Sequence, residues 1–194
     1  MTQPPSMPPP AHKEWARFLK SQIPGTVQVC KHRNDDDPSK WIDIFTSENS
    51  EGVVAATIGV MDFDQSRHGR TPVHTEILVD CRGHFPEVPN IAATIGQYLI
   101  KDGWKAAPGV TFAEMVSMYL PDLEVKHVLF VPPFQWENGM TEVELSDRTV
   151  YPLLAVPITD WELELVKDCG ADALESKWLE RSTDVLDWER KGFV

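Results

Sequence analysis

What the sequence lacks excludes several classes of protein. It has no Gly-x-Ser-x-Gly turn for a serine nucleophile and no glycine-rich loop that could hold phosphate groups. No stretch approaches the ~18 consecutive apolar residues of a membrane-spanning helix. Residues 1–10 have neither the basic start nor the apolar centre of a secretory signal. We therefore expect a cytoplasmic protein that does not act on nucleotides or membranes.

Cysteines and basic residues are both scarce. The three cysteines, Cys30, Cys81 and Cys169, are far apart and odd in number, which is typical of reduced thiols in a cytosolic protein. The 30 acidic and 18 basic side chains give a net charge of −12, which repels nucleic acids and anionic membranes. This acidity either keeps the protein soluble or speeds its encounter with a basic protein partner.

Proline, by contrast, is abundant, with 16 residues in a chain of 194. Five of the first ten residues are proline, which cannot donate a backbone hydrogen bond, and this segment has little to bury. We predict a disordered or polyproline-like tail over residues 1–10 and a single domain over residues 11–194, a length that is sufficient for its own core.

Hydrophobic periodicity predicts strands and helices in separate runs. The predicted helices cover residues 11–22, 89–102, about 160–170 and 172–181, the third starting at a capping box of Thr159 and Glu162 and the fourth carrying Leu174, Trp178 and Leu179 on one side. The predicted strands cover residues 27–32, 41–46, 53–60, 74–80, 125–131, about 143–145 and 150–156. Residues 110–119 fit either a strand or a short helix. The pattern predicts an α+β fold with a mixed, largely antiparallel sheet flanked by helices.

Side chains that can bind a metal are concentrated between residues 62 and 84, where imidazole, carboxylate and thiol groups occur close together in the sequence. They are Asp62, Asp64, His68, His74, Asp80, Cys81 and His84. Their spacing matches no tight ligand pattern, so we predict neither a metal nor another cofactor. Cys81 stands beside Arg82, which could lower its pKa, but a structural or simply exposed thiol is the alternative. We predict that the protein is not an enzyme.

Three tryptophans, Trp104, Trp136 and Trp161, stand at expected loop or helix starts. Such rings either serve as interface anchors or seal the edge of the core. Trp136 and Glu137 lie in a short segment between two apolar runs, and Glu142 and Glu144 alternate along a predicted strand and so share a face. A solvated strand face is the simpler use of these two carboxylates. As a hypothesis, we assign partner binding to Trp136, Glu137, Glu142 and Glu144.

An ordered set of segments also carries a family resemblance. The segments are Thr57–Met61, His74–Val79, Leu99–Trp104, Pro108–Val110, Lys126–Phe134, Leu153–Ile158 and the closing Asp184–Trp188. Together, from about Trp41 to Trp188, the chain resembles the bacterial branch of the suppressor of fused domain family.

The resemblance implies a mixed α+β domain and a protein that works by binding. Bacterial single-domain members resemble immunity proteins, which neutralise a cognate toxin by direct contact, and the acidic charge here suits a basic toxin. The eukaryotic relatives are scaffolds that clamp a peptide between two domains by strand addition, and this chain has room for the first domain only. A peptide-binding adaptor that uses a sheet edge is therefore the alternative, and an enzyme ranks third.

Overall fold

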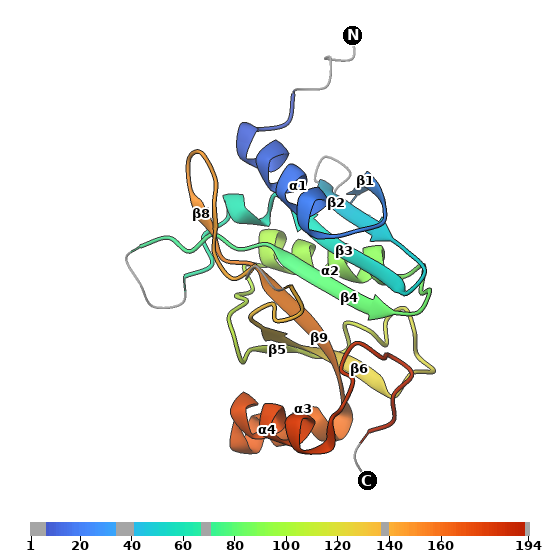
Figure 1. Cartoon of the computed structure of the whole chain (residues 1–194). Coiled ribbons are helices and arrows are strands. Elements are labelled where there is room, and N and C mark those ends of the chain that lie inside the picture. The colour runs from blue at the N-terminus through green and yellow to red at the C-terminus, as the bar shows by residue number, and fades with distance from the viewer. Residues whose placement is uncertain (1–6, 34–40, 67–70, 137–139, 193–194) are drawn as a thin grey trace.

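A seven-stranded mixed sheet carries helices on both faces in the computed structural model, which describes residues 7–33, 41–66, 71–136 and 140–192 (Figure 1). In spatial order the strands are β1 (Thr26–Arg33), β2 (Trp41–Glu48), β3 (Gly52–Ile58), β4 (Ile77–Arg82), β9 (Leu153–Thr159), β6 (Val125–Val131) and β5 (Thr111–Phe112). Only β4 and β9 pair in parallel, and all other neighbours are antiparallel. The predicted fold class is confirmed.

Helix α2 (Val88–Lys101) covers one face of the sheet. Its Ile91, Ile95 and Leu99 are buried against the sheet, as the helical spacing predicts. Gly103 has a φ of 67° just after the helix, where the left-handed conformation that ends many helices favours glycine. Within the described part of the chain no helix has the apolar length that crossing a membrane requires.

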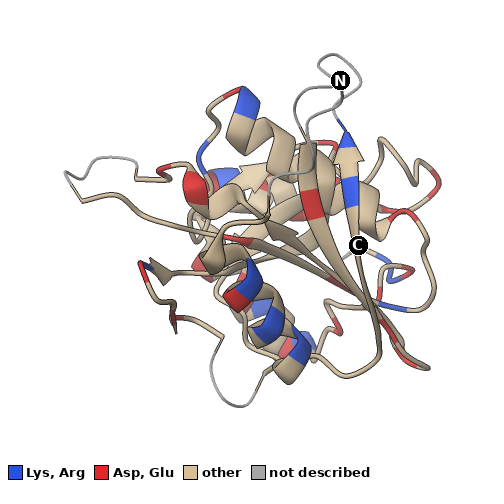
Figure 2. Cartoon of the chain, turned by 90° about the horizontal axis from the view of Figure 1, so that it is seen from above, with Lys and Arg blue, Asp and Glu red and all other residues tan. Residues whose placement is uncertain are grey.

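The opposite face of the sheet is covered by α1 (Pro10–Gln22), α3 (Asp160–Cys169) and α4 (Ala171–Arg181). A small hairpin of β7 (Val143–Glu144) and β8 (Thr149–Val150) lies on the same face, since Val143 and Val150 are buried in the same core as Trp15 of α1. Figure 2 shows charged residues mainly on helices and loops, while most of the sheet carries none. Helix α2 therefore covers one face of the sheet, and α1, α3, α4 and the hairpin cover the other.

The predicted capping box at the start of α3 is confirmed. The Thr159 hydroxyl accepts a hydrogen bond from the Glu162 N–H at 3.3 Å, and the Glu162 carboxylate accepts one from the Thr159 N–H at 2.8 Å. These reciprocal bonds satisfy two donors that a helix start otherwise leaves free. Gly170 ends the helix as predicted.

Two predicted strands are divided or shortened. The strand expected over residues 150–156 is split, because β8 pairs with β7 whereas β9 pairs with β4 and β6, and Pro152 between them has no N–H for a ladder. The strand expected over 53–60 ends at Ile58, since Gly59 has a φ of 118° and turns the chain into the 3-10 helix η1 (Val60–Asp62).

Three further expectations need correction or completion. The strand expected to start at His74 begins at Ile77, because His74 instead forms an isolated bridge with Val150 of the hairpin. Leu179 is 82% exposed and does not share the buried side of Leu174 and Trp178. The undecided stretch 110–119 contains the two-residue strand β5 followed by turns.

Candidate partner-binding surface

The β7–β8 hairpin presents carboxylates on the α1 side of the sheet. Glu142 and Glu144 are exposed on either side of the buried Val143, so alternation along the strand directs both to solvent. The Tyr151 hydroxyl, on a half-exposed ring, donates to the Glu142 carboxylate at 3.4 Å. Phe134, 59% exposed, follows β6. The hairpin therefore presents the half-exposed ring of Tyr151 beside an exposed carboxylate.

Ion pairs and hydrogen bonds anchor this hairpin to two other elements. Arg148, in the turn between β7 and β8, donates to the carbonyl of Met61 at 3.0 Å and to the carboxylate of Asp62 at 2.8 Å. Asp62 also pairs with His12 of α1 at 2.8 Å, and Glu14 of α1 accepts from the Ser146 N–H at 2.7 Å. Hairpin, η1 and α1 are therefore tied together.

The structure brings together part of the predicted site. Glu144 lies in β7 and Glu142 directly precedes this strand, and both side chains are exposed. Trp136 is half-buried and packs against the core on the α1 side, while Glu137 lies outside the described residues. Trp104 stacks on Tyr98 with ring centroids 4.4 Å apart, as a ring at the edge of the core would, and Trp161 keeps 44% exposure. Partner binding by these residues stays a prediction.

A fully buried carboxyl supports η1, and sequence reasoning missed it. Glu76 accepts hydrogen bonds from the Gly59 N–H at 2.7 Å, the Met61 N–H at 3.1 Å and the Thr57 hydroxyl. Burial raises the pKa of Glu76 to about 8, although these hydrogen bonds oppose the shift. A charged residue type inside the apolar run Thr75–Val79 was the available signal.

The ligand types between residues 62 and 84 do not converge in the described residues. His74 bonds the Met61 carbonyl at 2.8 Å, Asp64 accepts from the Ser66 and Val73 N–H groups, and Asp80 accepts from Gln135 at 3.0 Å. His84 lies 3.1 Å from a carboxylate oxygen of Glu48, which belongs to β2 and not to the stretch 62–84. His68 lies outside the described residues. Each of these side chains serves a separate local contact.

Three potential ligands gather elsewhere, at Glu114, His127 and Asp160. Nδ1 of His127 accepts a hydrogen bond from the Glu114 N–H at 2.9 Å, so the proton of a neutral ring must be on Nε2, which lies 2.9 Å from Asp160. Both ring nitrogens are thus engaged, and Lys126 also binds Asp160. The arrangement fits a structural clamp that holds Glu114 at its positive φ of 62° better than a metal site.

Cys81, the cysteine that precedes Arg82 in the sequence, is buried. The Cys81 thiol is 1% exposed, and burial raises its pKa, so the effect expected from Arg82 is wrong. Arg82 instead pairs with Asp184. All three cysteines are free thiols. Cys81 is buried, whereas Cys30 and Cys169 are exposed.

Comparison with known proteins gives consistent results. The model of the family described as suppressor of fused protein (SUFU) matches residues 36–191. A curated relative, "Immunity protein YqcF" of Bacillus subtilis (strain 168), is 30% identical over 187 residues, which are 94% of this chain and 97% of the relative.

Solved structures share the fold at lower identity. A putative SUFU homolog from Neisseria gonorrhoeae has a TM-score of 0.65 and 16% identity, covering 94% of this chain and 93% of its own. A chain of the Sufu–Fu complex has a TM-score of 0.66 and 15% identity, and the alignment covers 95% of this chain and 92% of that chain. Drosophila Suppressor of Fused has a TM-score of 0.54 and 14% identity. The alignment covers 98% of this chain and 53% of the Drosophila chain.

Proposed function

The chain belongs to the suppressor of fused family, and from that premise we propose that it is an immunity protein that neutralises a protein toxin by binding it. The observation that carries the proposal is the likeness to an immunity protein over nearly the full length of both chains. The match covers 94% of this chain and 97% of the relative, so it is not limited to one shared motif.

The charge of the chain points to a basic toxin. A net charge of −12 attracts a basic protein at long range and speeds the encounter. Glu142 and Glu144 offer exposed carboxylates on a hairpin that Arg148 anchors, so they would meet the partner with little loss of backbone freedom. The half-buried Trp136, which packs against the same core as Val143 and Val150 of the hairpin, would add apolar contact area.

Neutralisation would proceed by occlusion rather than by chemistry. A bound protein of this size excludes substrate from a toxin's active site without any reaction of its own. The buried thiol of Cys81 and the doubly engaged ring of His127 agree with this mechanism, because neither presents a free nucleophile or base at the surface.

Co-expression tests the proposal. The chain is produced in a bacterial host together with the product of the adjacent gene, taken as the candidate toxin, and growth is measured. We expect the chain to restore growth and to co-purify with the toxin. The double variant Glu142→Lys/Glu144→Lys should protect less, whereas the control Glu175→Lys/Glu180→Lys, with the same charge change on exposed positions of α4, should protect fully. A toxin that neither binds nor is silenced would refute the proposal.

Peptide binding along a sheet edge is the second candidate function, and β1 is the observation that favours it. All eight residues of β1 pair with β2 on one side. On its other side no strand pairs with it among the described residues. An edge of this length can accept an extended peptide through main-chain hydrogen bonds.

A further inference from the structure

A pocket of about 310 Å³ lies on the α2 face of the sheet, beside the edge strand β1. Gln28 of β1 and Thr46 of β2 both line it and are cross-strand partners. Thr46 is two residues from Ile44, which packs in the core with α2, so both side chains lie on the α2 face. Further lining residues come from the segment 84–89, which leads into α2. The pocket therefore adjoins the edge along which β1 has no second partner strand among the described residues.

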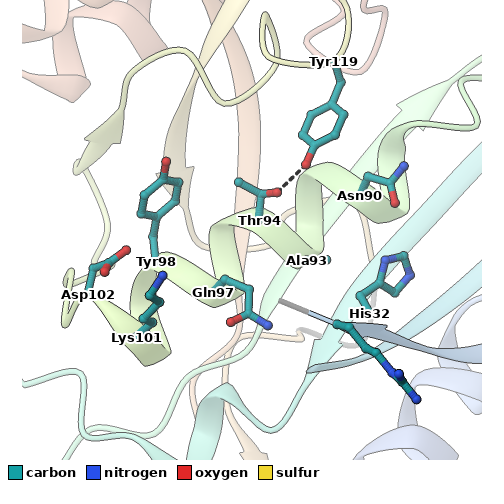
Figure 3. A pocket seen from close by; sticks show the side chains of 10 residues that line it. His32, Asn90, Ala93, Thr94, Gln97, Tyr98, Lys101, Asp102 and Tyr119 are labelled. Carbon is teal, nitrogen blue, oxygen red and sulfur yellow. Dashed lines mark hydrogen bonds between the residues drawn. The ribbon is translucent and has the colours of Figure 1, made fainter. Parts of the chain in front are cut away.

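The hydroxyl of Thr46 is an unused hydrogen-bonding group in this pocket. Thr46 is 6% exposed, and its side chain makes no hydrogen bond to a described residue. In another pocket beside α2, by contrast, the hydroxyls of Thr94 and Tyr119 bond each other at 2.6 Å (Figure 3). Buried polar groups normally have a partner, so water or a bound group must supply one for Thr46.

The polar groups of the pocket are well suited to accept hydrogen bonds. Nδ1 of His84 lies 3.1 Å from Oε1 of Glu48, and because a carboxylate only accepts, this nitrogen carries the proton. Nε2 of a neutral ring is then an acceptor, as is the second carboxylate oxygen of Glu48. The Thr46 hydroxyl and the Gln28 amide oxygen can accept as well. A group that only donates therefore fits the pocket, and the arginine guanidinium has five N–H donors and no acceptor.

The charge around the pocket favours a cation. Glu48 is the one formally charged residue among the described lining residues, if His84 is neutral. The Gly83 N–H donates to the Glu51 carbonyl at 2.9 Å, which brings a second glutamate close to this loop. Arg82 lies in the same loop but pairs with Asp184. In a chain of net charge −12 the pocket is therefore a place where a positive group is attracted.

The remaining lining is apolar and suits the stem of a long side chain. Val53 is 7% exposed, and Phe85, Pro86 and Pro89 come from the segment before α2 and its first turn. Phe85 is held in place by stacking on Trp188, with ring centroids 5.9 Å apart. Arginine stems pack on such apolar surface, and guanidinium planes stack on aromatic rings. The volume is at the lower end of about 300–1,000 Å³ for ligand pockets, which suits one long side chain.

The edge of β1 would deliver such a side chain. A segment that pairs with β1 directs alternate side chains to the α2 face, and the Cβ opposite Gln28 would lie about 5 Å from that of Gln28. A long side chain at this position reaches the pocket. A second copy of β1 would place Gln28, Cys30 and His32 on this face but no arginine, since Arg33 alternates to the other face.

We propose that this pocket takes the arginine side chain of an extended protein segment that pairs with β1. The proposal rests on the second candidate function above, and it names the residue of the partner that the chain would recognise. Main-chain hydrogen bonds to β1 would supply sequence-independent affinity, whereas the pocket would select arginine at one position of the segment.

The test is a titration of the isotopically labelled full chain with three blocked peptides, followed by NMR. Each peptide is Thr-Val-Xaa-Val-Thr, in which Xaa is arginine, its uncharged analogue citrulline, or alanine. We expect all three to shift signals of residues 27–33, and the arginine peptide also to shift those of 46–48 and 84–89 and to bind at least about tenfold more tightly than the citrulline peptide. Equal binding of all three at β1 would overturn the arginine pocket but leave the sheet-edge function. Binding by no peptide would overturn both.

Two variants of the pocket complete the experiment. Glu48→Gln should weaken the arginine peptide about tenfold, whereas the control Glu175→Gln, with the same charge change on an exposed position of α4, should not. Thr46→Val should also weaken the peptide, yet it should not lower the Tm, because the hydroxyl that it removes has no partner among the described residues. A purely structural Thr46 would instead lower the Tm and leave the affinity unchanged. Unchanged affinity in both variants would overturn the proposal, and so would self-association through β1 in sedimentation.

Discussion

Two glutamates, Glu76 and Glu162, are completely buried, yet they are satisfied in different ways. Glu162 faces a cation: Arg190, itself 7% exposed at the side chain, donates to its carboxylate at 3.0 Å, and the Trp178 indole N–H donates at 2.8 Å. The hydrogen bonds to Glu76 come from neutral donors, two backbone N–H groups and a hydroxyl. Burial without a cation raises the pKa of the Glu76 carboxyl, whereas Arg190 gives the Glu162 carboxylate a charged hydrogen-bond donor.

The difference matters because each glutamate holds a different part of the protein. Glu76 binds the N–H groups of η1, and η1 in turn anchors Arg148 of the hairpin that we assign to toxin binding. Glu162 links α3 to α4 and to the C-terminal segment through Trp178 and Arg190. The hairpin side should therefore respond to pH and the α3–α4 side to loss of a cation.

The largest effect is expected from Arg190→Met, which breaks the buried pair and leaves the Glu162 carboxylate without its cation. Removing one partner of such a pair costs about 3–5 kcal/mol. Urea unfolding should show a loss in this range. The control Lys191→Met changes an 81% exposed side chain and should be close to neutral. An Arg190→Met protein as stable as the parent would mean that the pair is not important for stability.

The next largest effect is a pH dependence that Glu76→Gln removes. Because the pKa of Glu76 is raised to about 8, the folded protein keeps a proton that the unfolded chain loses above its ordinary value of 4.5. The contribution of Glu76 to the free energy of unfolding is complete below about pH 4.5, and it falls by roughly 1.4 kcal/mol per pH unit until about pH 8.

Glutamine reproduces the protonated acid, since its carbonyl can accept from Gly59 and Met61 and its amide can donate to the Thr57 oxygen. The free energy of unfolding, measured for both proteins from pH 5 to pH 8, should therefore fall more steeply in the parent than in the variant. Parallel curves would contradict a buried, protonated Glu76.

The smallest effect on stability is expected from Arg148→Ala, which detaches the hairpin from η1. The Arg148 side chain is 23% exposed, so we expect a loss of only about 1 kcal/mol. Toxin affinity should decline more than stability does, because the carboxylates of the hairpin would lose their anchored position. Equal affinity for the toxin in calorimetry would place the interface away from the hairpin.

Local patterns in the sequence predicted much of the fold, and the unpredicted parts depend on distant contacts. Thr159 and Glu162 are three residues apart, so the capping box was visible as a pattern and is confirmed. The partners Trp178 and Arg190 of the same Glu162 are 16 and 28 residues away, and no spacing rule indicates them. The division between β8 and β9 likewise follows from pairing with β7, β4 and β6, which the sequence alone does not show.

The candidate surface was predictable only in part for the same reason. Alternation around Val143 predicted that Glu142 and Glu144 share a face. It could not indicate that Arg148 holds the hairpin against Asp62, or that Glu76 orders η1 beneath it, since these contacts join segments 86 and 15–19 residues apart.

Immunity by direct binding is tested most directly by isothermal titration calorimetry at low and high salt, in which the purified chain is titrated against the product of the adjacent gene as the candidate toxin. We predict saturable one-to-one binding that weakens as salt screens the acidic surface, and weaker binding for Glu142→Lys/Glu144→Lys than for Glu175→Lys/Glu180→Lys. Absence of binding at low salt, with both proteins folded, would contradict the proposal.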